Sequence, residues 1–122
     1  MKEVLIVDDD PRNIFALKAT LQSKGIQCRT AGDAETALRL LEENKGIGVV
    51  LMDMMMPEID GYQAIAAIRG KHELAQTIVI AVTAQAMVGD REKCLEAGAD
   101  DYISKPVDVD LLMKKLQHFL NR

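Results

Sequence analysis

The stretch Val4-Leu5-Ile6-Val7-Asp8-Asp9-Asp10-Pro11 places four apolar residues directly before three aspartates and a proline. A short β-branched run predicts a buried strand, and Asp10-Pro11 predicts that a helix begins immediately after it. Two further runs are similar: 49–52 precedes Asp53, and 78–82 precedes Thr83. If these strands lie parallel, their C-terminal ends share one edge of a sheet, where ligands commonly bind. The sequence therefore predicts an acidic site at that edge.

Strand and helix patterns alternate along the rest of the chain. Further strands are predicted over 26–30 and 102–104, and helices are predicted from Pro11, after Asp33, from Asp60-Gly61, over about 88–97 and from about Asp108. Gly46-Ile47-Gly48 predicts a break before the third strand. The predicted fold class is α/β: one doubly wound, five-stranded parallel sheet with five helices, a single domain over residues 1–122. We expect the first and third strands near the middle of the sheet.

The composition limits the class of protein. A chain of 122 residues that is 48% hydrophobic and only 3% aromatic predicts one domain with an aliphatic core. The net charge of −4 and the lack of a basic patch argue against nucleic acid as a direct partner. Cys28 and Cys94 lie outside any CxxC pattern, which is typical of a reducing compartment. With neither a signal-peptide pattern nor a membrane-length apolar run, we expect a cytoplasmic protein without membrane contact.

The predicted acidic edge is a candidate metal site. Asp8-Asp9-Asp10 alone would be explained by a solvated loop with Asp10 as a helix cap. That interpretation leaves Asp53, at the end of another strand, unexplained. Carboxylates packed together repel one another unless a cation neutralises them. Oxygen ligands with room for water favour Mg²⁺, with Mn²⁺ as the alternative ion.

Asp53 is also a candidate nucleophile. A carboxylate can accept a phosphoryl group as an aspartyl phosphate, provided that cations and hydrogen-bond donors hold the phosphoryl oxygens. Lys105 supplies a compact positive charge. The Thr83 hydroxyl and the Ala84 amide supply donors. A cis peptide bond at Lys105-Pro106, which only proline makes common, would turn this lysine inward.

Four motifs together resemble the receiver domain of two-component response regulators. They are Ile6–Pro11, Leu51–Gly61, Val82-Thr83-Ala84 and Tyr102–Pro106. The resemblance extends over essentially the whole chain and implies the flavodoxin-like (βα)5 fold. It leaves open whether the chain is a single-domain regulator or a receiver from a hybrid histidine kinase. The Met1 start and the lack of a linker favour the former, whereas the sequence after Ser104 also resembles receivers of hybrid kinases.

The resemblance assigns roles to the acidic site. Asp53 is implied to be the phosphoacceptor, which takes its phosphoryl group from a histidine of a sensor kinase or of a histidine phosphotransfer protein. Asp9 and Asp53 are implied to ligate magnesium directly, Asp8 through water, and Met55 through its backbone carbonyl. Lys105 is implied to pair with Asp53 and then with the phosphoryl group.

The resemblance also implies a switch. Thr83 and Tyr102 match the family's switch pair, whose repositioning changes the face formed by the fourth helix, fifth strand and fifth helix. Partners are expected at this face, and phosphorylation-dependent dimerisation is a further expectation. Met55 and Gln85 occupy the positions that tune dephosphorylation, and a hydrophobic Met55 implies a long-lived phosphoryl group. Such a protein is not an enzyme acting on other substrates, since it catalyses only its own phosphotransfer and autodephosphorylation.

Other functions compete with this interpretation. A phosphohydrolase of the haloacid-dehalogenase type needs a second acid two residues after the nucleophile, where this chain has Met55. A nucleotide-binding module needs glycines after the first strand, where this chain has aspartates. A protein-interaction module of the same fold that works without phosphorylation is the alternative that stays open. It predicts unchanged partner affinity after Asp53→Asn.

Overall fold

The computed structural model describes residues 2–56, 60–83 and 89–121. In chain order the elements are β1 (Glu3–Val7), α1 (Pro11–Ser23), β2 (Cys28–Ala31), α2 (Ala34–Glu43), β3 (Ile47–Asp53), α3 (Gly61–Gly70), the 3-10 helix η1 (His72–Leu74), β4 (Ile78–Thr83), α4 (Asp90–Glu96), β5 (Asp101–Ser104) and α5 (Val109–Leu120). In the part of the chain so described, every helix is too short or too polar to cross a membrane.

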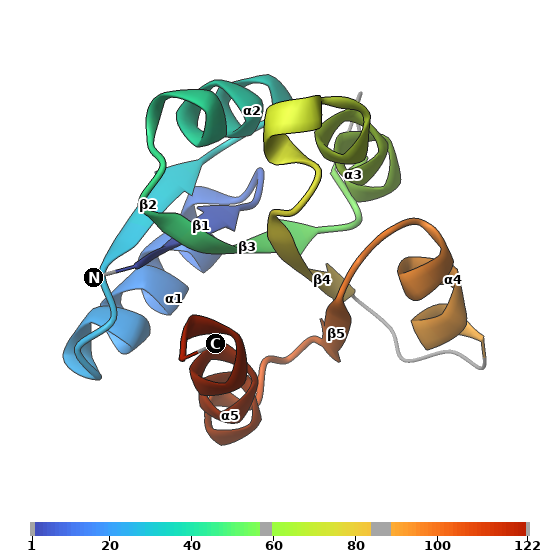
Figure 1. Cartoon of the computed structure of the whole chain (residues 1–122). Coiled ribbons are helices and arrows are strands. Elements are labelled where there is room, and N and C mark those ends of the chain that lie inside the picture. Colours follow the sequence, from blue (N-terminus) through green and yellow to red (C-terminus); the bar gives the residue numbers. More distant parts are fainter. Residues whose placement is uncertain (1, 57–59, 84–88, 122) are drawn as a thin grey trace.

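The sheet has five parallel strands in the order β2-β1-β3-β4-β5. The prediction of one doubly wound parallel sheet, with β1 and β3 near its middle, is therefore confirmed. In Figure 1, α2 and α3 lie on one face of the sheet and α1 and α5 on the other, with α4 beyond β5. Val7 pairs with Met52, and Asp53 pairs with Val82. This register brings the C-terminal ends of the central strands to one edge.

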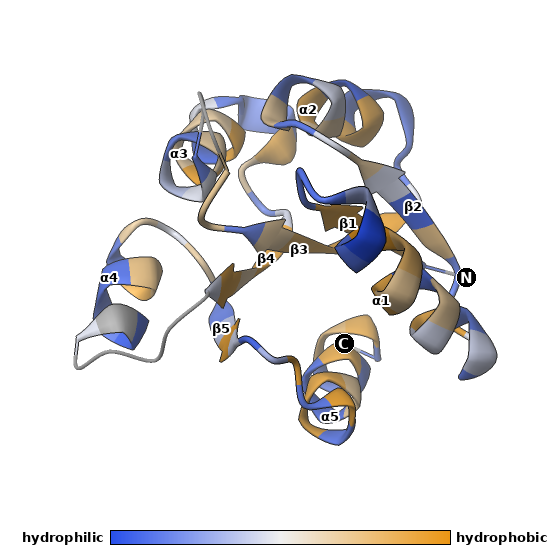
Figure 2. Cartoon of the chain, turned by 180° about the vertical axis from the view of Figure 1, so that it is seen from behind, coloured by the Kyte–Doolittle hydropathy of each residue, from blue (hydrophilic) through white to orange (hydrophobic). Residues whose placement is uncertain are grey.

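Both faces of the sheet are buried. Successive strand residues enter opposite sides of the core: Val4 and Ile6 pack toward α1 and α5, whereas Leu5 and Val7 pack toward α2 and α3. Figure 2 shows the same arrangement, with hydrophobic strands and helices whose polar faces turn outward. Burial on both faces explains why these strands are continuous apolar runs instead of alternating ones.

Aspartate caps begin four of the described helices, at places where the sequence predicts that helices start. The side chains of the cap residues accept a hydrogen bond from a backbone N–H in the first turn, at 2.7–3.2 Å: Asp10, Asp33, Asp60 and Asp108. Each bond satisfies a donor that the helix itself leaves free. In α3 the Gln63 side chain also accepts from the Asp60 N–H, which completes a capping box. These caps fix where each loop at the acidic edge ends.

Three predicted boundaries are wrong. The strand predicted over 26–30 begins at Cys28, because the Ile26 N–H donates to Leu21 O at 3.0 Å and completes the end of α1. The break predicted at Gly46-Ile47-Gly48 is the start of β3. A Cβ at Gly48 would lie 2.9 Å from the Lys2 side chain, so glycine permits close packing here.

The fourth helix is shorter than predicted and begins at Asp90, after Gly89 at φ 88°.

Candidate functional site

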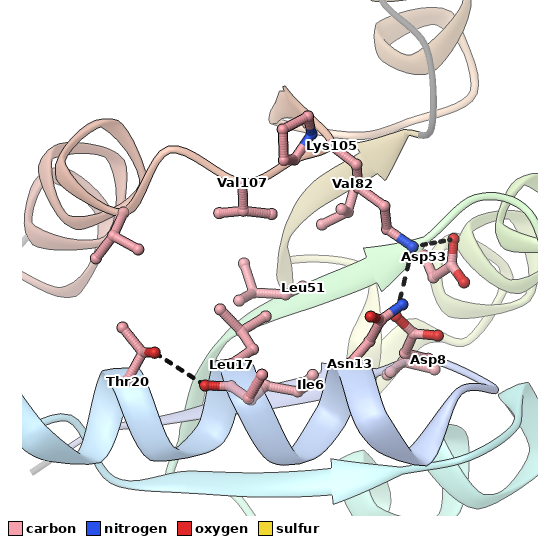
Figure 3. A pocket seen from close by; sticks show the side chains of 14 residues that line it. Ile6, Asp8, Asn13, Leu17, Thr20, Leu51, Asp53, Val82, Lys105 and Val107 are labelled. Atoms are coloured by element: carbon pink, nitrogen blue, oxygen red, sulfur yellow. Dashed lines mark hydrogen bonds and ion pairs between the residues drawn. The ribbon is translucent and has the colours of Figure 1, made fainter.

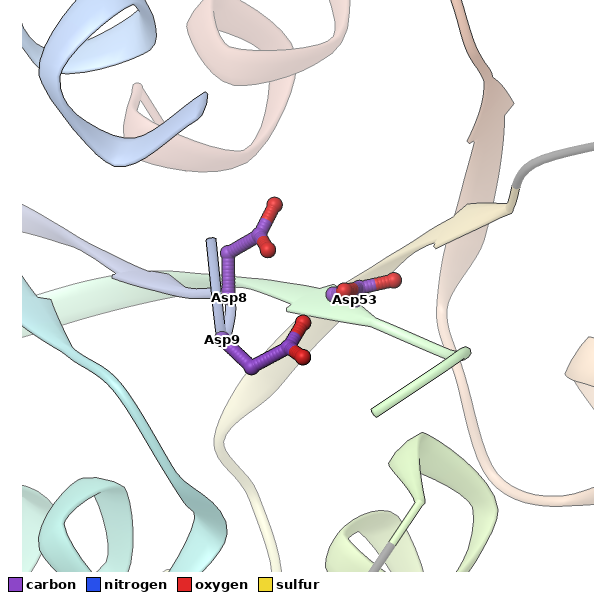
Figure 4. Close-up of side chains that lie close together, drawn as sticks. All are labelled: Asp8, Asp9 and Asp53. Carbon is purple, nitrogen blue, oxygen red and sulfur yellow. The ribbon is translucent and has the colours of Figure 1, made fainter. Parts of the chain in front are cut away.

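Three carboxylates meet at the C-terminal edge of the two central strands. Asp8 follows β1 directly and Asp53 is the last residue of β3. One carboxylate oxygen from each of Asp8, Asp9 and Asp53 lies within 4.8 Å of the others (Figure 4). Asp8 and Asp53 are buried, whereas Asp9 is exposed. The site is thus closed toward the sheet and open to solvent at Asp9.

This cluster fits a hard divalent cation. Its donors are carboxylate oxygens, which Mg²⁺ and Mn²⁺ prefer. The exposure of Asp9 leaves space for water, which Mg²⁺ usually retains among its ligands. Three acids held this close would repel each other without a cation. The residues present could therefore hold a metal ion.

Lys105 reaches the same site from the loop after β5. Its Nζ lies 3.6 Å from Asp8 Oδ2 and 3.7 Å from Asp53 Oδ1. The Lys105 N–H donates to Thr83 O at 2.7 Å, which fixes the start of this loop against the end of β4. The Lys105–Pro106 peptide bond is cis. Among the described residues, one ammonium pairs with two of the three clustered carboxylates, so the cluster keeps an excess of negative charge that a divalent cation would balance.

Backbone N–H groups orient the two buried carboxylates. Asp8 Oδ1 accepts from the Asp10 N–H at 2.9 Å, and Asp53 Oδ1 accepts from the Met55 N–H at 3.0 Å. Burial raises the pKa of the Asp53 carboxyl above its ordinary value. The Met55 N–H opposes this rise, the Asp8 charge adds to it, and the Lys105 ammonium opposes it. Asp53 is therefore a desolvated carboxylate held in a fixed orientation.

A groove of about 560 Å³ leads away from the carboxylates along α1. Its floor and walls include Leu17 of α1, Leu51 of β3 and Val107 of the loop after β5, while Asp8, Asp53 and Lys105 line its polar end (Figure 3). The groove gives the site a polar end and an apolar extension between α1 and the segment that leads into α5.

The remaining predicted residues are distributed around this site. Thr83 is buried at the end of β4, and Tyr102 in β5 is half-buried against the core. The Met55 side chain is 67% exposed. Ala84 and Gln85 lie outside the described residues, so the Ala84 amide and the Gln85 side chain are not placed.

Two features of the site were missed by the sequence reasoning. The N–H groups of Asp10 and Met55 each bond a carboxylate two residues earlier, an Asx-type spacing that the sequence contains. That spacing could have predicted both contacts. No sequence pattern indicates the groove, because its width depends on how α1 and the segment before α5 pack against the sheet.

The chain is similar to receiver domains throughout. The sequence pattern of the response regulator receiver domain family matches residues 4–117. The sensor histidine kinase RcsC of Salmonella typhimurium is 42% identical over 120 residues, which cover 98% of this chain and 12% of that kinase. The chain thus spans only a small part of this relative.

Solved structures give the same result. The receiver domain of a sensor histidine kinase from Pseudomonas aeruginosa, crystallised with magnesium in its active site cleft, superposes with a TM-score of 0.88 at 36% identity, covering 99% of this chain and 98% of that one. A Saccharomyces cerevisiae receiver domain, crystallised with a histidine phosphotransfer protein, gives 0.85 at 29% identity, with coverage of 97% and 88%. With the doubly wound sheet and the three-carboxylate edge, these matches show that the chain belongs to the response regulator receiver domain family.

Proposed function

We propose that Asp53 accepts a phosphoryl group from a phosphohistidine of a sensor histidine kinase or a histidine phosphotransfer protein. The observation that carries the proposal is the position of the Lys105 ammonium, 3.7 Å from the buried Asp53 carboxylate and 3.6 Å from Asp8. An ammonium there attracts the phosphoryl oxygens while the carboxylate attacks phosphorus. The yeast receiver domain crystallised with a phosphotransfer protein supports a donor of this class.

The transfer is a substitution at phosphorus. An Asp53 carboxylate oxygen forms a bond to phosphorus as the bond from phosphorus to the donor imidazole nitrogen breaks, and the imidazole keeps the electron pair of that bond. The Met55 N–H, 3.0 Å from Asp53 Oδ1, orients the nucleophile. The Lys105 ammonium, the Thr83 hydroxyl and the Ala84 amide then hold the phosphoryl oxygens.

We infer that the reaction depends on Mg²⁺, with Mn²⁺ able to replace it. Asp9 and Asp53 would hold the ion directly, Asp8 through water, and Met55 through its carbonyl. Bound there, the ion neutralises charge on the phosphoryl oxygens. The solved receiver domain from Pseudomonas aeruginosa that contains magnesium supports this assignment.

The proposed output is a change in protein binding. Thr83 and Tyr102 form the switch pair, and the face made by α4, β5 and α5 is the surface that a downstream protein partner binds. Tyr102 is half-buried and packs against the core beside β4, so a rotation of its ring would change this face. Phosphorylation-dependent dimerisation is proposed as a second form of output. The chain then catalyses only its own phosphotransfer and autodephosphorylation.

The phosphoryl group is proposed to be long-lived. Met55, two residues after Asp53, carries an apolar side chain that does not orient an attacking water, and Gln85 occupies the other tuning position. The decay of phosphorylated protein after removal of the donor measures this directly. A half-life of a few seconds would contradict the proposal.

Incubation with acetyl phosphate and Mg²⁺, followed by intact mass spectrometry, tests the function. Wild type should gain one phosphoryl group, and neither the Asp53→Asn variant nor wild type in EDTA should gain it. No gain by folded wild type would refute the proposal and favour the interaction module that works without phosphorylation. That alternative also predicts equal partner affinity for wild type and Asp53→Asn.

A further inference from the structure

Four methionines lie next to Asp53 in the sequence, and one of them differs from the other three in its exposure to solvent. Met52, Met54 and Met56 are buried, with exposures of 0%, 2% and 7%, whereas Met55 is 67% exposed. Met55 also donates its N–H to Asp53 Oδ1 at 3.0 Å. An exposed methionine is therefore hydrogen-bonded, through its own backbone N–H, to the carboxylate that is proposed to take the phosphoryl group.

We propose that Met55 is a site of reversible oxidation by a peroxide, and that its oxidation shortens the lifetime of the phosphoryl group on Asp53. The inference rests on the proposed function of Asp53. One hydrogen peroxide transfers an oxygen atom to the Met55 sulfur, and water leaves; the sulfur is oxidised to the sulfoxide and the peroxide is reduced. Methionine sulfoxide reductases reverse this modification.

The other described methionines and cysteines are buried or half-buried. Cys94 is fully buried, and burial raises the pKa of the Cys28 thiol, so little of the reactive thiolate forms there. Besides the three buried methionines, Met113 in α5 is half-buried against the core. Among the methionines and cysteines in the described ranges, Met55 is the most exposed residue. Oxidation follows exposure, so we expect peroxide to modify Met55 first.

The chemical change alters what this side chain does to water. A thioether accepts hydrogen bonds weakly, whereas a sulfoxide is a polar group with an oxygen acceptor. Because Met55 is exposed and its backbone N–H bonds Asp53 Oδ1, we expect that oxygen to hold and orient a water molecule near the aspartyl phosphate. Groups that position water and take up part of its proton accelerate hydrolysis. Oxidation of Met55 therefore increases the rate at which the aspartyl phosphate hydrolyses.

The test compares each protein with and without peroxide. Wild type and Met55→Leu, which keeps the apolar bulk but has no sulfur at this position, are treated with dilute hydrogen peroxide and mapped by peptide mass spectrometry. Both are then phosphorylated with acetyl phosphate and Mg²⁺, and decay is followed after removal of the donor. We expect the half-life of wild type to fall roughly three- to tenfold, below the full effect of a general base. The half-life of Met55→Leu should not respond to peroxide.

Two further measurements complete the design. Methionine sulfoxide reductase should restore the original half-life of wild type, and untreated Met55→Gln, with a polar oxygen at the same position, should resemble oxidised wild type. Oxidation at Met55 without a change in half-life would overturn the inference while leaving the proposed function intact. So would oxidation of buried methionines before Met55, or an equal response of Met55→Leu. Failure of untreated wild type to gain any phosphoryl group would refute the proposed function and this inference together.

Discussion

The charge balance of the site depends on the side chain of Lys105. Within the described ranges it supplies the ammonium that pairs with both Asp8 and Asp53, at 3.6 Å and 3.7 Å. Two buried carboxylates that share one cation repel each other strongly once the cation is removed. The same ammonium is proposed to stabilise charge on the phosphoryl oxygens. We therefore expect a change at Lys105 to affect both the resting protein and the proposed phosphotransfer.

Lys105→Ala should slow phosphorylation of Asp53 by acetyl phosphate about 100-fold, the cost of losing one group that stabilises the transition state. The rate is measured from the mass-shifted fraction over time. Lys71→Ala is the matched control, because Lys71 pairs with Glu42 on the surface, away from the carboxylates. A Lys105→Ala rate within about twofold of wild type would remove Lys105 from the mechanism.

Asp53 makes the stability of the metal-free protein depend on pH. Burial raises its pKa, so the folded chain keeps this proton to a higher pH than the unfolded chain does. The free energy of unfolding therefore falls as the pH rises from the unfolded pKa through the folded pKa. Asn at this position does not ionise and should lack this fall.

In EDTA, Asp53→Asn should accordingly be more stable than wild type at pH 7, because the unfolded chain ionises Asp53 more readily than the folded chain does. The difference should diminish as the pH falls toward the ordinary Asp value of about 4. Urea unfolding at a series of pH values measures both quantities. A wild type that is the more stable protein at pH 7 without metal would show that the Asp53 carboxylate is not desolvated.

At the scale of elements, the start of α3 packs directly onto the end of β3. A Cβ at Gly61 would lie 2.5 Å from Met54 Sδ, 2.6 Å from Met54 Cα and 2.7 Å from Asp53 O. Two of these atoms belong to the backbone and cannot move without displacing Asp53. The absence of a side chain at Gly61 is therefore part of what positions the carboxylate.

Gly61→Ala should reduce the free energy of unfolding by about 1–3 kcal/mol, the usual cost of overpacking, and should slow phosphorylation as well. Gly70→Ala, at the other end of the same helix, meets nothing within 4 Å and should be neutral or stabilising by up to about 1 kcal/mol. Urea unfolding of both variants gives the comparison. Equal stabilities would mean that the chain accommodates a Cβ at the start of α3.

Local chemistry decided which elements could be predicted from the sequence. The caps at Asp10, Asp33 and Asp108 were predictable because a side-chain acceptor acts within a few residues of its donor. The start of β3 was not, because Gly48 is a turn signal in sequence but is a strand residue packed closely against the Lys2 and Leu120 side chains. Contacts of that kind join distant parts of the chain.

For the molecule as a whole, parallel topology is what made the site predictable. Asp8, Asp53 and Thr83 follow or end three apolar runs, and parallel strands bring such ends to one edge. Side-chain exposure was not predictable in the same way, since Met54 and Met55 are neighbours yet one is buried and the other exposed. The groove beside α1 likewise depends on how the helices pack against the sheet.

Metal binding should stabilise the folded chain as a unit. A ligand at a hundred times its Kd raises the free energy of unfolding by about 3 kcal/mol, so Mg²⁺ should raise the Tm of wild type. Asp9→Asn should lose most of this gain, and because Asp9 is exposed its stability in EDTA should change little. Asp110→Asn, an exposed acid in the first turn of α5, should respond to Mg²⁺ like wild type. Equal Mg²⁺ responses of all three proteins would argue against the three-carboxylate metal site.

The phosphoryl group is proposed to be carried as an acyl phosphate on Asp53. The most direct measurement is borohydride reduction of phosphorylated protein followed by peptide mass spectrometry, because borohydride converts an aspartyl phosphate to homoserine. We predict homoserine at position 53 and aspartate at positions 8 and 9. Reduction at Asp8 or Asp9, or a phosphoryl group that resists reduction and lies on another residue, would rule out Asp53 as the phosphoacceptor.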